Sequence, residues 1–500
     1  MIYLFIFFCI FIVGDTMEYI INGYKLDKEQ TKIVLDKSKY LLVVAGAGSG
    51  KTLTILGKIG YLLDHDIKPN EILCISFTKK ASSSLESKIK EEFNIKVPVF
   101  TFHKLGLEIL KENNTKFEIA DSNLLEDIIN NFFKIDIYNY PKLIKLVLKY
   151  FDTKLSYNKF SSIHNKKIEL LSKTLATFIR LFKCNNYKIE DYKTFFKRIK
   201  WTFSYANYKK ESIFLLLALN IYLSYNAYLK ENKEIDFDDM LIEATNYIKE
   251  HGYAKKIKYI IIDEYQDTSK VRFNLIKEIL KITDASLMVV GDDFQSIYRF
   301  TGCDIDLFLN FNKYLKDART LKIINTYRNS QELIKVAGNF VMKNKRQIRK
   351  RLKSNKSISK PIEIVYYHDL NKELDKLIKE LDSDYIILGR NNNDVNLLSD
   401  RFKEKFMTVH KSKGLEWNNV LIINLKDDIL GFPNKIKEEK IFRLISPSLD
   451  KYPYSEERRL FYVALTRTKN KVYLLTQNKN SSIFIKELIH DYKMLKSHHQ

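Results

Sequence analysis

The sequence contains little cysteine, proline or glycine: its 500 residues include 4 cysteines, 7 prolines and 15 glycines. Cys9, Cys74, Cys184 and Cys303 are too far apart to form a CxxC pair or a Cys/His zinc pattern, and too few to cross-link a chain of this length. These absences exclude a disulfide-stabilised scaffold and favour a reducing compartment. Since no internal repeat or low-complexity block is found, the domain boundaries must be inferred from motifs.

Long hydrophobic runs are also scarce. Residues 2–13 are apolar throughout, but this run is shorter than the roughly 18 to 20 residues that span a bilayer, and no Lys or Arg precedes it as in a signal peptide. We therefore expect residues 1–16 to be a dispensable leader before a start at Met17. A genuine hydrophobic anchor within residues 1–13 is the alternative. The apolar stretch 213–223 is interrupted by Asn220 and indicates a buried core helix.

Charge of one sign predominates. The chain has 84 Lys and Arg against 61 Asp and Glu, a net charge of +23, which favours a polyanionic partner. Lysine is also abundant together with Asn, Ile and Tyr, as in AT-rich coding sequences, so the scattered excess is weak evidence by itself. Residues 341–360 concentrate nine basic side chains and no acidic one. This stretch is either a solvated loop or helix face, or a phosphate-contacting or mobile surface element.

Short apolar runs alternate with helical patterns, which predicts parallel α/β sheets. A chain of this length makes roughly three or four domains. Strands are predicted at residues 40–44, 72–77, 259–262 and 287–290. Residues from about 107 to 226 carry long amphipathic patterns instead, which indicates a helical insertion. After about residue 317 a second alternation begins, with strands predicted at residues 361–367, 385–388, 420–424 and 472–475.

A glycine-rich turn follows the first predicted strand. It reads AGAGSGKT and departs from the strict P-loop expression only in the Ala at its first position. Glycines let successive backbone N–H groups and the following helix N-terminus converge on phosphate oxygens. Lys51 is expected to reach the β- and γ-phosphates, and the Thr52 hydroxyl to bind Mg²⁺. The nucleotide-binding residues predicted here are Ala45, Gly46, Ala47, Gly48, Ser49, Gly50, Lys51 and Thr52.

Acidic residues end the third predicted strand, in YIIIDEYQDTS at 259–269. Two adjacent carboxylates after an apolar run are costly to bury without a cation. Asp263 is expected to hold Mg²⁺ through water, and Glu264 to polarise the attacking water. A further segment, GDDFQSIYRF at 291–300, also follows a strand. There Gln295 can contact a γ-phosphate or the lytic water, and Tyr298 and Phe300 offer flat faces to bases.

These three segments, in this order, resemble the UvrD/Rep branch of superfamily-one helicases. Further segments extend the resemblance over most of the chain: LDKEQ (26–30) is similar to the Q motif, SFTKKAS (76–82) to motif Ia, VFTFHKLG (99–106) to motif Ib, DFDDM (236–240) to the acidic signature, INTYRNS (324–330) to motif IV, TVHKSKGLEW (408–417) to motif V and EERRLFYVALTRTKNKVYLL (456–475) to motif VI. The order of the segments makes coincidence negligible.

The resemblance implies an α/β fold with two RecA-like parallel-sheet domains and a helical insertion in the first. The expected divisions are a leader at 1–16, a first core at 17–106 and 227–316, the insertion at 107–226, a second core at 317–480 and a tail at 481–500.

The resemblance also assigns roles to nucleotide-facing residues. Gln30 would read adenine, Tyr327 would stack on it, and Glu416 would contact the ribose. Arg328 and Arg467 would be arginine fingers, which stabilise the transferring phosphoryl charge. With Lys51, Asp263, Glu264 and Gln295, these arginines complete the predicted catalytic set. On the DNA side, the residues that would contact a single strand are Phe77, Thr78, Thr101, His103, Tyr298, Phe300, His410 and Lys413.

The sequence departs from the family pattern in three places. Between Arg390 and Thr408 the chain is too short for the accessory domain that larger relatives carry there, so their duplex-binding and autoinhibitory arrangement is in doubt. Phe300 stands where Trp is usual, and Thr301 replaces the following Arg, which weakens one stacking or strand contact. No nuclease-like segment follows motif VI within this sequence.

The function implied is that of an ATP-dependent DNA helicase that moves 3′ to 5′ on single-stranded DNA with ATP and Mg²⁺. Single-stranded DNA and single/double-strand junctions are the expected partners, with replication or repair proteins as further candidates. We expect a monomer without stable membrane association, in the cytoplasm or at sites of DNA replication. The alternatives are a translocase that displaces proteins or remodels forks without processive unwinding, and one that acts on RNA, because stacking is largely indifferent to the sugar.

Two readings from other classes fit less well. A P-loop kinase does not need the second nucleotide-facing domain that motifs IV to VI supply. A catalytically dead nucleic-acid binder does not need the complete predicted catalytic set.

Overall fold

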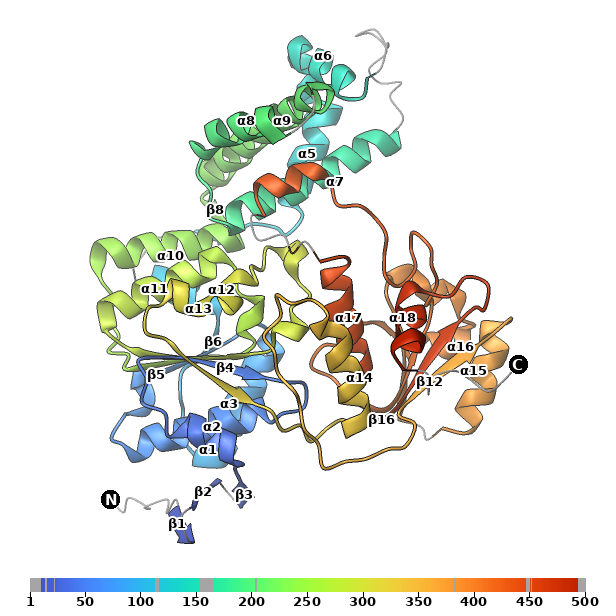
Figure 1. Ribbon diagram of the computed structural model, residues 1–500. Coiled ribbons are helices and arrows are strands. Elements are labelled where there is room, and N and C mark those ends of the chain that lie inside the picture. Colours follow the sequence, from blue (N-terminus) through green and yellow to red (C-terminus); the bar gives the residue numbers. More distant parts are fainter. Residues whose placement is uncertain are drawn as a thin grey trace.

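The computed structural model describes residues 10–13, 16–21, 23–112, 117–152, 165–202, 205–381, 384–446, 450 and 452–492. Two parallel sheets with helices on both faces lie side by side, and a group of helices lies above the first (Figure 1). This arrangement confirms the expected α/β class with two parallel-sheet cores.

The first sheet has six parallel strands in the order β11-β4-β10-β9-β5-β6. Alternate residues of its buried strands face opposite sides, because successive side chains of a strand point to opposite faces. In β4, Leu42 and Val44 face one core cluster, and Leu41 and Val43 face the other. The strands are β4 (Tyr40–Ala45), β5 (Ile72–Ser76), β6 (Val99–Thr101), β9 (Tyr259–Ile262), β10 (Ser286–Gly291) and β11 (Arg319–Ile323).

Helices cover both faces of the first sheet (Figure 1). One face packs against α1 (Lys28–Val34), α2 (Lys51–Asp64) and α3 (Lys79–Phe93). The other packs against α4 (Phe102–Lys111), α10 (Phe237–His251), α11 (Lys270–Thr283), α12 (Asp306–Leu309) and α13 (Phe311–Tyr314). Two predicted DNA-contacting residues cap helices with their side chains: Thr78 caps α3 and Thr101 caps α4.

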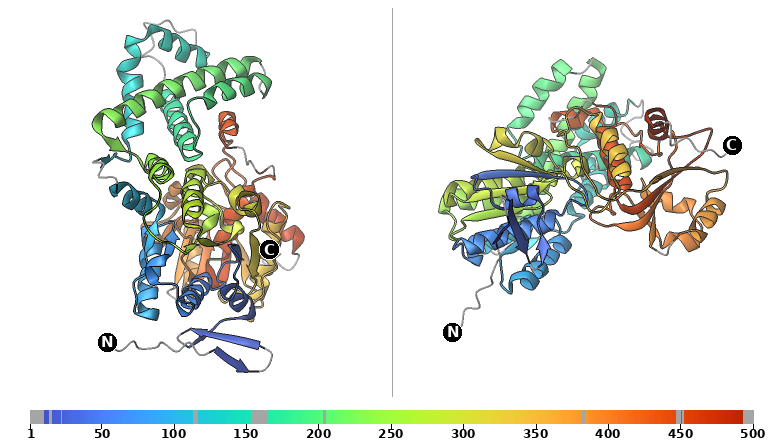
Figure 2. Two further views of the ribbon diagram at one scale, coloured as in Figure 1. Left: turned by 90° about the vertical axis from the view of Figure 1, so that its left-hand side faces the viewer. Right: turned by 60° about the horizontal axis from the view of Figure 1, so that its bottom comes forward.

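The helical insertion stands above the first core (Figures 1 and 2). Its buried residues are continuous with the upper core of the first sheet, so the two parts are packed together. It consists of α5 (Leu124–Lys134), α6 (Pro141–Tyr150), α7 (Asn165–Cys184), α8 (Asp191–Thr202) and α9 (Tyr205–Asn232), with a short parallel pair β7 (Glu118–Ile119) and β8 (Glu234–Ile235) at its base.

One helix of the described residues, Asn207–Asn232 within α9, is long and apolar enough to cross a membrane. It packs against α5, α6, α7 and α8. Phe214, Leu215 and Leu217 are fully buried there, which confirms the prediction of a core helix in this region.

The second sheet has five parallel strands in the order β12-β16-β15-β13-β14. These are β12 (Ile362–Tyr366), β13 (Tyr385–Gly389), β14 (Phe406–Thr408), β15 (Trp417–Ile422) and β16 (Thr468–Thr476). One face packs against α14 (Gln331–Met342), α17 (Ser455–Leu465) and α18 (Ile483–Asp491), and the other against α15 (Leu370–Lys379) and α16 (Asp400–Lys403).

The structure corrects four of the predicted boundaries. The second core does not begin at 317, because β11 pairs with β4 and packs Ile323 into the core of the first sheet. The insertion does not begin at 107 or end at 226, because α4 packs on α10 and α9 continues to Asn232. The second core extends past 480, because α18 buries Phe484 and Leu488 in it.

An N-terminal hairpin lies at the end of the molecule opposite the insertion (Figure 2). Residues 10–13 of the predicted leader form β1 (Ile10–Val13), which pairs antiparallel with β2 (Thr16–Ile21). A third strand, β3 (Tyr24–Lys25), pairs with β2. Residues 1–9, 14 and 15 of the predicted leader lie outside the described residues.

A segment of the second core crosses to the insertion. Between β15 and α17, the short helix η8 (Lys440–Leu444) packs Ile441, Phe442 and Leu444 into the same core cluster as α5, α6, α7 and α9. Figure 1 shows this segment beside α7, far from the sheet to which its flanking strands belong. We call residues 437–446 the strap; they give the second core a direct contact with the insertion.

Candidate functional site

The glycine-rich turn lies between β4 and α2, as predicted. Gly48 and Gly50 adopt left-handed backbone conformations, with φ of 68° and 77°. A Cβ at Gly48 would lie 2.4 Å from the Cβ of Arg328, so only glycine lets that segment approach. The approach is held by two hydrogen bonds: the Thr326 hydroxyl donates to Ala47 O (2.7 Å), and the Tyr327 N–H donates to Gly48 O (2.9 Å).

Lysine and carboxylate meet at the turn. Lys51 Nζ lies 2.6 Å from Glu264 Oε1. Burial opposes the charge of Lys51, but Glu264 and Asp263 outweigh it and raise the pKa of the lysine. Burial likewise opposes the charge of Glu264, but Lys51 and Lys413 lower the pKa of this carboxyl to about 2. Both groups are therefore charged at neutral pH.

The pKa of Asp263 shifts in the opposite direction to that of Glu264. Burial and the adjacent Glu264 raise its pKa to about 6, against the pull of Lys51. A buried carboxylate with this balance is stabilised by a cation. The hydroxyl of Ser49 in the turn is buried without a hydrogen-bond partner, which fits a loop that binds a polar ligand. Oxygen ligands suit Mg²⁺, so Asp263 and Thr52 fit the metal that we predicted.

The segment GDDFQSIYRF at 291–300, which we call motif III, meets motif VI at Gln295. Its Oε1 accepts a hydrogen bond from Arg467 Nη2 at 3.2 Å. Arg467 is buried, and its guanidinium also donates to the carbonyls of Val463 and Leu415. Burial and Arg328 lower the pKa of Arg467 to about 9, so it remains charged at neutral pH. Two predicted catalytic groups from distant segments are thus in contact.

Arg328 and Tyr327 belong to the segment that contacts the glycine-rich turn, and they also line the predicted nucleotide site. Arg328 Nε lies 2.7 Å from Glu416 Oε2, and Glu416 also pairs with Lys469 (3.1 Å). The Glu416 carboxylate is therefore engaged with two cations, in addition to its predicted ribose contact. The Tyr327 ring is 63% exposed, as a stacking surface requires, and its hydroxyl donates to Asp27 Oδ2 (2.9 Å).

Gln30 is buried beneath the turn. Its Nε2 donates to Ser49 O at 3.2 Å, and its Oε1 accepts from the Asp27 N–H at 3.0 Å. The side chain thus joins the cap of α1 to the phosphate-binding turn. The structure places Gln30 at the predicted site, and its adenine contact stays a prediction.

Three aromatic rings gather where motif III meets motif V. The Phe300 ring lies 5.7 Å from His410 and 6.2 Å from Tyr298, and the Tyr298 hydroxyl donates to His410 O (3.0 Å). Phe300 is 60% exposed. Burial and Arg390 lower the pKa of His410 to about 4, so its ring is neutral at pH 7. An exposed ring held by two others is a suitable platform for a base.

A second group of predicted DNA-contacting residues lies on the first core. Thr78 and Thr101 stand at the N-termini of α3 and α4, where backbone N–H groups attract phosphate. Phe77 packs edge-on against Phe102 (5.4 Å). Burial and Arg272 lower the pKa of His103 to about 4.

Sequence reasoning missed two residues of this group. The ring of Phe237, 47% exposed, lies 4.9 Å from His103, and Arg272 lies over Phe77 at 5.1 Å. An aromatic residue inside the acidic segment DFDDM was the available signal for Phe237. No local pattern marked Arg272, whose position depends on how α11 packs.

Lys413, predicted to contact single-stranded DNA, is held by groups of the nucleotide side. Its side chain is 8% exposed and donates to Asp267 Oδ2 (2.5 Å) and to Gln295 O (2.8 Å), with Glu264 at 4.0 Å. It therefore lies with the acidic groups of the nucleotide side, because buried carboxylates there require a cation. Its Nζ also lies 4.9 Å from the Tyr298 ring centre. Lys413 therefore lies between the nucleotide side and the aromatic rings, and its contact with single-stranded DNA stays a prediction.

The basic stretch 341–360 is neither a plain solvated surface nor wholly free for phosphate. Lys350 is buried between Asp292 and Asp293, Arg346 pairs with Asp306 (2.9 Å), and Lys343 pairs with Glu487 (2.8 Å). The exposed basic side chains of the stretch are Lys345, Arg349, Arg351, Lys353 and Lys360.

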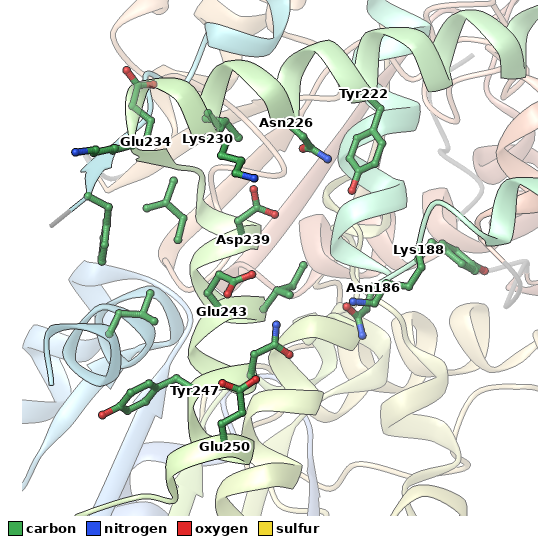
Figure 3. A pocket seen from close by; sticks show the side chains of 18 of the residues that line it. Asn186, Lys188, Tyr222, Asn226, Lys230, Glu234, Asp239, Glu243, Tyr247 and Glu250 are labelled. Carbon is green, nitrogen blue, oxygen red and sulfur yellow. The ribbon is translucent and has the colours of Figure 1, made fainter. Parts of the chain in front are cut away.

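A separate hollow of about 660 Å³ lies between the insertion and the first core (Figure 3). Asp239, Glu243 and Glu250 of α10 point toward it, with Lys230 and Asn226 of α9 opposite. None of the predicted site residues lines this hollow.

Comparisons with known proteins agree with these features. The UvrD/REP helicase N-terminal domain matches residues 26–316, and the UvrD-like helicase C-terminal domain matches residues 403–479. The chain is 27% identical to DNA helicase IV of Escherichia coli K12, over 94% of this chain and 70% of that protein. It is 29% identical to the ATP-dependent DNA helicase Rep of Buchnera aphidicola (from Acyrthosiphon pisum), over 69% of this chain and 49% of Rep.

A similar likeness holds for the ATP-dependent DNA helicase PcrA of Staphylococcus aureus, which is 28% identical over 76% of this chain and 50% of PcrA. The chain thus spans about half the length of these Rep and PcrA relatives. The first domain match alone covers more than half of the chain, and it includes the turn, the acidic strand end and Gln295. The chain belongs to the UvrD/Rep helicase family.

Proposed function

We propose that the protein is an ATP-driven motor that moves 3′ to 5′ on single-stranded DNA and separates duplex strands as a monomer. The observation that carries the proposal is the contact of Gln295 with Arg467. It joins motif III to motif VI three residues before Tyr298 and five before the exposed Phe300. A change at the phosphates therefore has a short path to the aromatic platform.

The nucleotide side has the parts that hydrolysis requires. Lys51 binds the β- and γ-phosphates, and Tyr327, Gln30 and Glu416 hold the nucleoside. Thr52 and Asp263 would hold Mg²⁺, which would neutralise phosphate charge when bound. Glu264 has a low pKa, so it is ionised and able to orient and accept a proton from the lytic water.

Lys51 changes partner during the cycle. Its ion pair with Glu264 blocks both groups. Incoming phosphate oxygens compete for Lys51 and release Glu264 toward the water. Arg328 and Arg467 then supply positive charge to the transferring phosphoryl group, an effect worth on the order of 10³ to 10⁵ in rate.

Single-stranded DNA binds on the side of motif III away from the nucleotide. Phe300, with Tyr298 and His410, stacks on bases, and the starts of α3 and α4 bind phosphates beside Phe77, His103 and Phe237. Lys413 contacts Asp267 and the Gln295 carbonyl and lies over Tyr298, so it connects the two sides. Stacking is worth about 1 to 3 kcal/mol per base.

The decisive experiment measures ATPase and strand separation with 3′-tailed and 5′-tailed DNA and RNA. We expect strong stimulation by single-stranded DNA and separation of 3′-tailed DNA duplexes. Separation of 5′-tailed substrates, or a preference for RNA, would overturn the polarity or the substrate. Stimulated ATPase and displacement of a bound protein without strand separation would support the alternative motor. An enzyme without DNA-stimulated ATPase would refute the proposal.

A further inference from the structure

Lys350 occupies an unusual position for a residue of a basic stretch. Its side chain is fully buried, and its Nζ contacts Asp292 Oδ1 at 2.6 Å and Asp293 Oδ1. Both carboxylates are fully buried as well. The ammonium also lies 3.6 Å from the centre of the Phe294 ring. Lys350 comes from the connection between α14 and β12, whereas the carboxylates follow β10 of the first sheet.

Such a cluster is expensive to bury. Charges taken from water lose much of their hydration energy, and an apolar replacement is often neutral or stabilising. Stability alone is therefore a weak explanation for this group. Its position suggests another explanation, because Asp292 accepts a hydrogen bond from a second side chain, in addition to the backbone N–H of Phe294 (3.1 Å).

That side chain is Gln295. Asp292 Oδ2 accepts a hydrogen bond from Gln295 Nε2 at 2.8 Å, while Oδ1 faces Lys350. An ionised carboxylate only accepts hydrogen bonds. It therefore holds the NH₂ end of the Gln295 amide and turns the oxygen, Oε1, toward Arg467 Nη2 at 3.2 Å. A turned amide would place NH₂ against the guanidinium, so two donors would face each other.

We propose that Lys350 is a positioning residue for ATP hydrolysis: it keeps Asp292 a pure acceptor, and Asp292 fixes the Gln295 amide so that its oxygen faces Arg467. This inference rests on the proposed function, in which Gln295 and Arg467 act on the γ-phosphate. It also gives the basic stretch a role inside the motor, since Lys350 lies outside the sequence motifs that carry the other groups.

The charges around Asp292 explain why the lysine is required. Asp292 is faced by Lys350 and Asp293, by Lys51 of the P-loop helix, and by Tyr462 and Arg467 of motif VI. Lys51 and Arg467 both have other partners, Glu264 and Gln295. Without Lys350, two adjacent buried carboxylates would share a proton. A protonated Asp292 can donate to Gln295 Oε1 and turn the amide.

The experiment compares Lys350→Met, which keeps much of the shape and removes the charge, with Lys350→Arg. The matched control is Lys183→Met, because Lys183 of the insertion is 3% exposed and also pairs with two carboxylates, Asp236 and Asp239, at the start of α10. DNA-stimulated kcat per folded molecule should fall by about 10- to 100-fold in Lys350→Met, the range for side chains that orient an essential group. The KM for ATP should change less than about threefold, and Lys350→Arg should recover most of kcat.

The pH profile distinguishes positioning from structural support. In Lys350→Met the acidic limb of kcat should move to higher pH, because two adjacent buried carboxylates then lack the cation that opposes their protonation. Lys183→Met should keep the wild-type profile and kcat. An unchanged kcat or profile in Lys350→Met, or an effect confined to KM, would overturn the inference.

A further variant covers the case in which Lys350→Met does not fold. Asp292→Asn keeps the lysine but presents NH₂ to Gln295, so it should also lower kcat. A wild-type kcat in Asp292→Asn would refute the inference that Asp292 positions Gln295. Since wild type is measured alongside, a failure of the proposed function is seen as absent wild-type turnover, separately from a failure of this inference.

Discussion

Lys51 Nζ lies 2.6 Å from Glu264 Oε1, so the cation expected to bind phosphate and the carboxylate expected to act on water neutralise each other. Neither is free for hydrolysis while this pair persists. The two residues should therefore differ in what their removal does.

We expect Lys51→Ala and Glu264→Gln both to abolish turnover, with opposite effects on binding. Lys51→Ala removes a phosphate contact of the ground state, so nucleotide affinity should fall. Glu264→Gln removes the charge that competes for Lys51, so nucleotide affinity should persist or rise. Fluorescent-nucleotide titration and steady-state ATPase check this. Parental ATPase in either variant would contradict the assignment.

Much of the site could be predicted because its residues lie in short segments next to strand ends. The turn around Lys51, the carboxylates Asp263 and Glu264, and Gln295 are local patterns, and a parallel sheet brings its strand ends to one edge. The same reasoning predicted the positions of most strands to within a few residues.

Other features depend on distant partners. β11 has an unremarkable sequence, and only its pairing with β4 shows that it belongs to the first sheet. Lys413 and Lys350 are basic residues like many others in the chain, and their burial depends on which carboxylates the fold brings beside them. No pattern within either segment predicts which carboxylates will lie beside these lysines.

Phe300→Ala should uncouple translocation from hydrolysis. Removal of one stacking platform costs about 1 to 3 kcal/mol per base, whereas Gln295 and Arg467 keep their contact. Basal ATPase should stay within about twofold, while DNA stimulation and strand separation fall at least tenfold. Ile282→Ala, another exposed apolar residue, is the control. Equal unwinding by Phe300→Ala and wild type would argue against the platform.

Binding to single-stranded DNA should weaken steeply with salt. Lys and Arg side chains that contact phosphates release counterions, and the logarithm of affinity falls by about 0.7 per neutralised phosphate for each tenfold rise in salt. Fluorescence anisotropy from low to moderate salt measures the slope. Blunt duplex should stimulate ATPase poorly in the same buffers. A salt-independent, DNA-independent ATPase rate would be inconsistent with the motor.

Acid should destabilise the protein through His103 and His410. Burial lowers both pKa values from an ordinary 6.5 to about 4, so between these values the unfolded chain binds protons that the folded chain does not. The free energy of unfolding should be highest above pH 6.5 and should fall as pH decreases toward 4. Urea midpoints at pH 7 and 5 check this. His410→Gln should flatten the dependence, and an unchanged slope would count against it.

The strap should couple the insertion to the second core. The chain has no room for an accessory domain between Arg390 and Thr408, and Phe442 on the strap belongs to the buried core cluster that includes residues of α5, α6, α7 and α9. Phe442 is 8% exposed, and truncating a buried Phe to Ala costs about 3 to 5 kcal/mol of packing.

We therefore expect Phe442→Ala to release the strap while both cores and their ATPase contacts persist. Single-turnover separation of 3′-tailed duplexes should fall with increasing duplex length, because the insertion no longer follows the second core, while ATPase stimulated by single strands stays within about twofold. Ile429→Ala, 63% exposed between β15 and the strap, is the control and should unwind like the parent. If Phe442→Ala unwinds long duplexes as well as the parent, the strap does not transmit movement between the two parts.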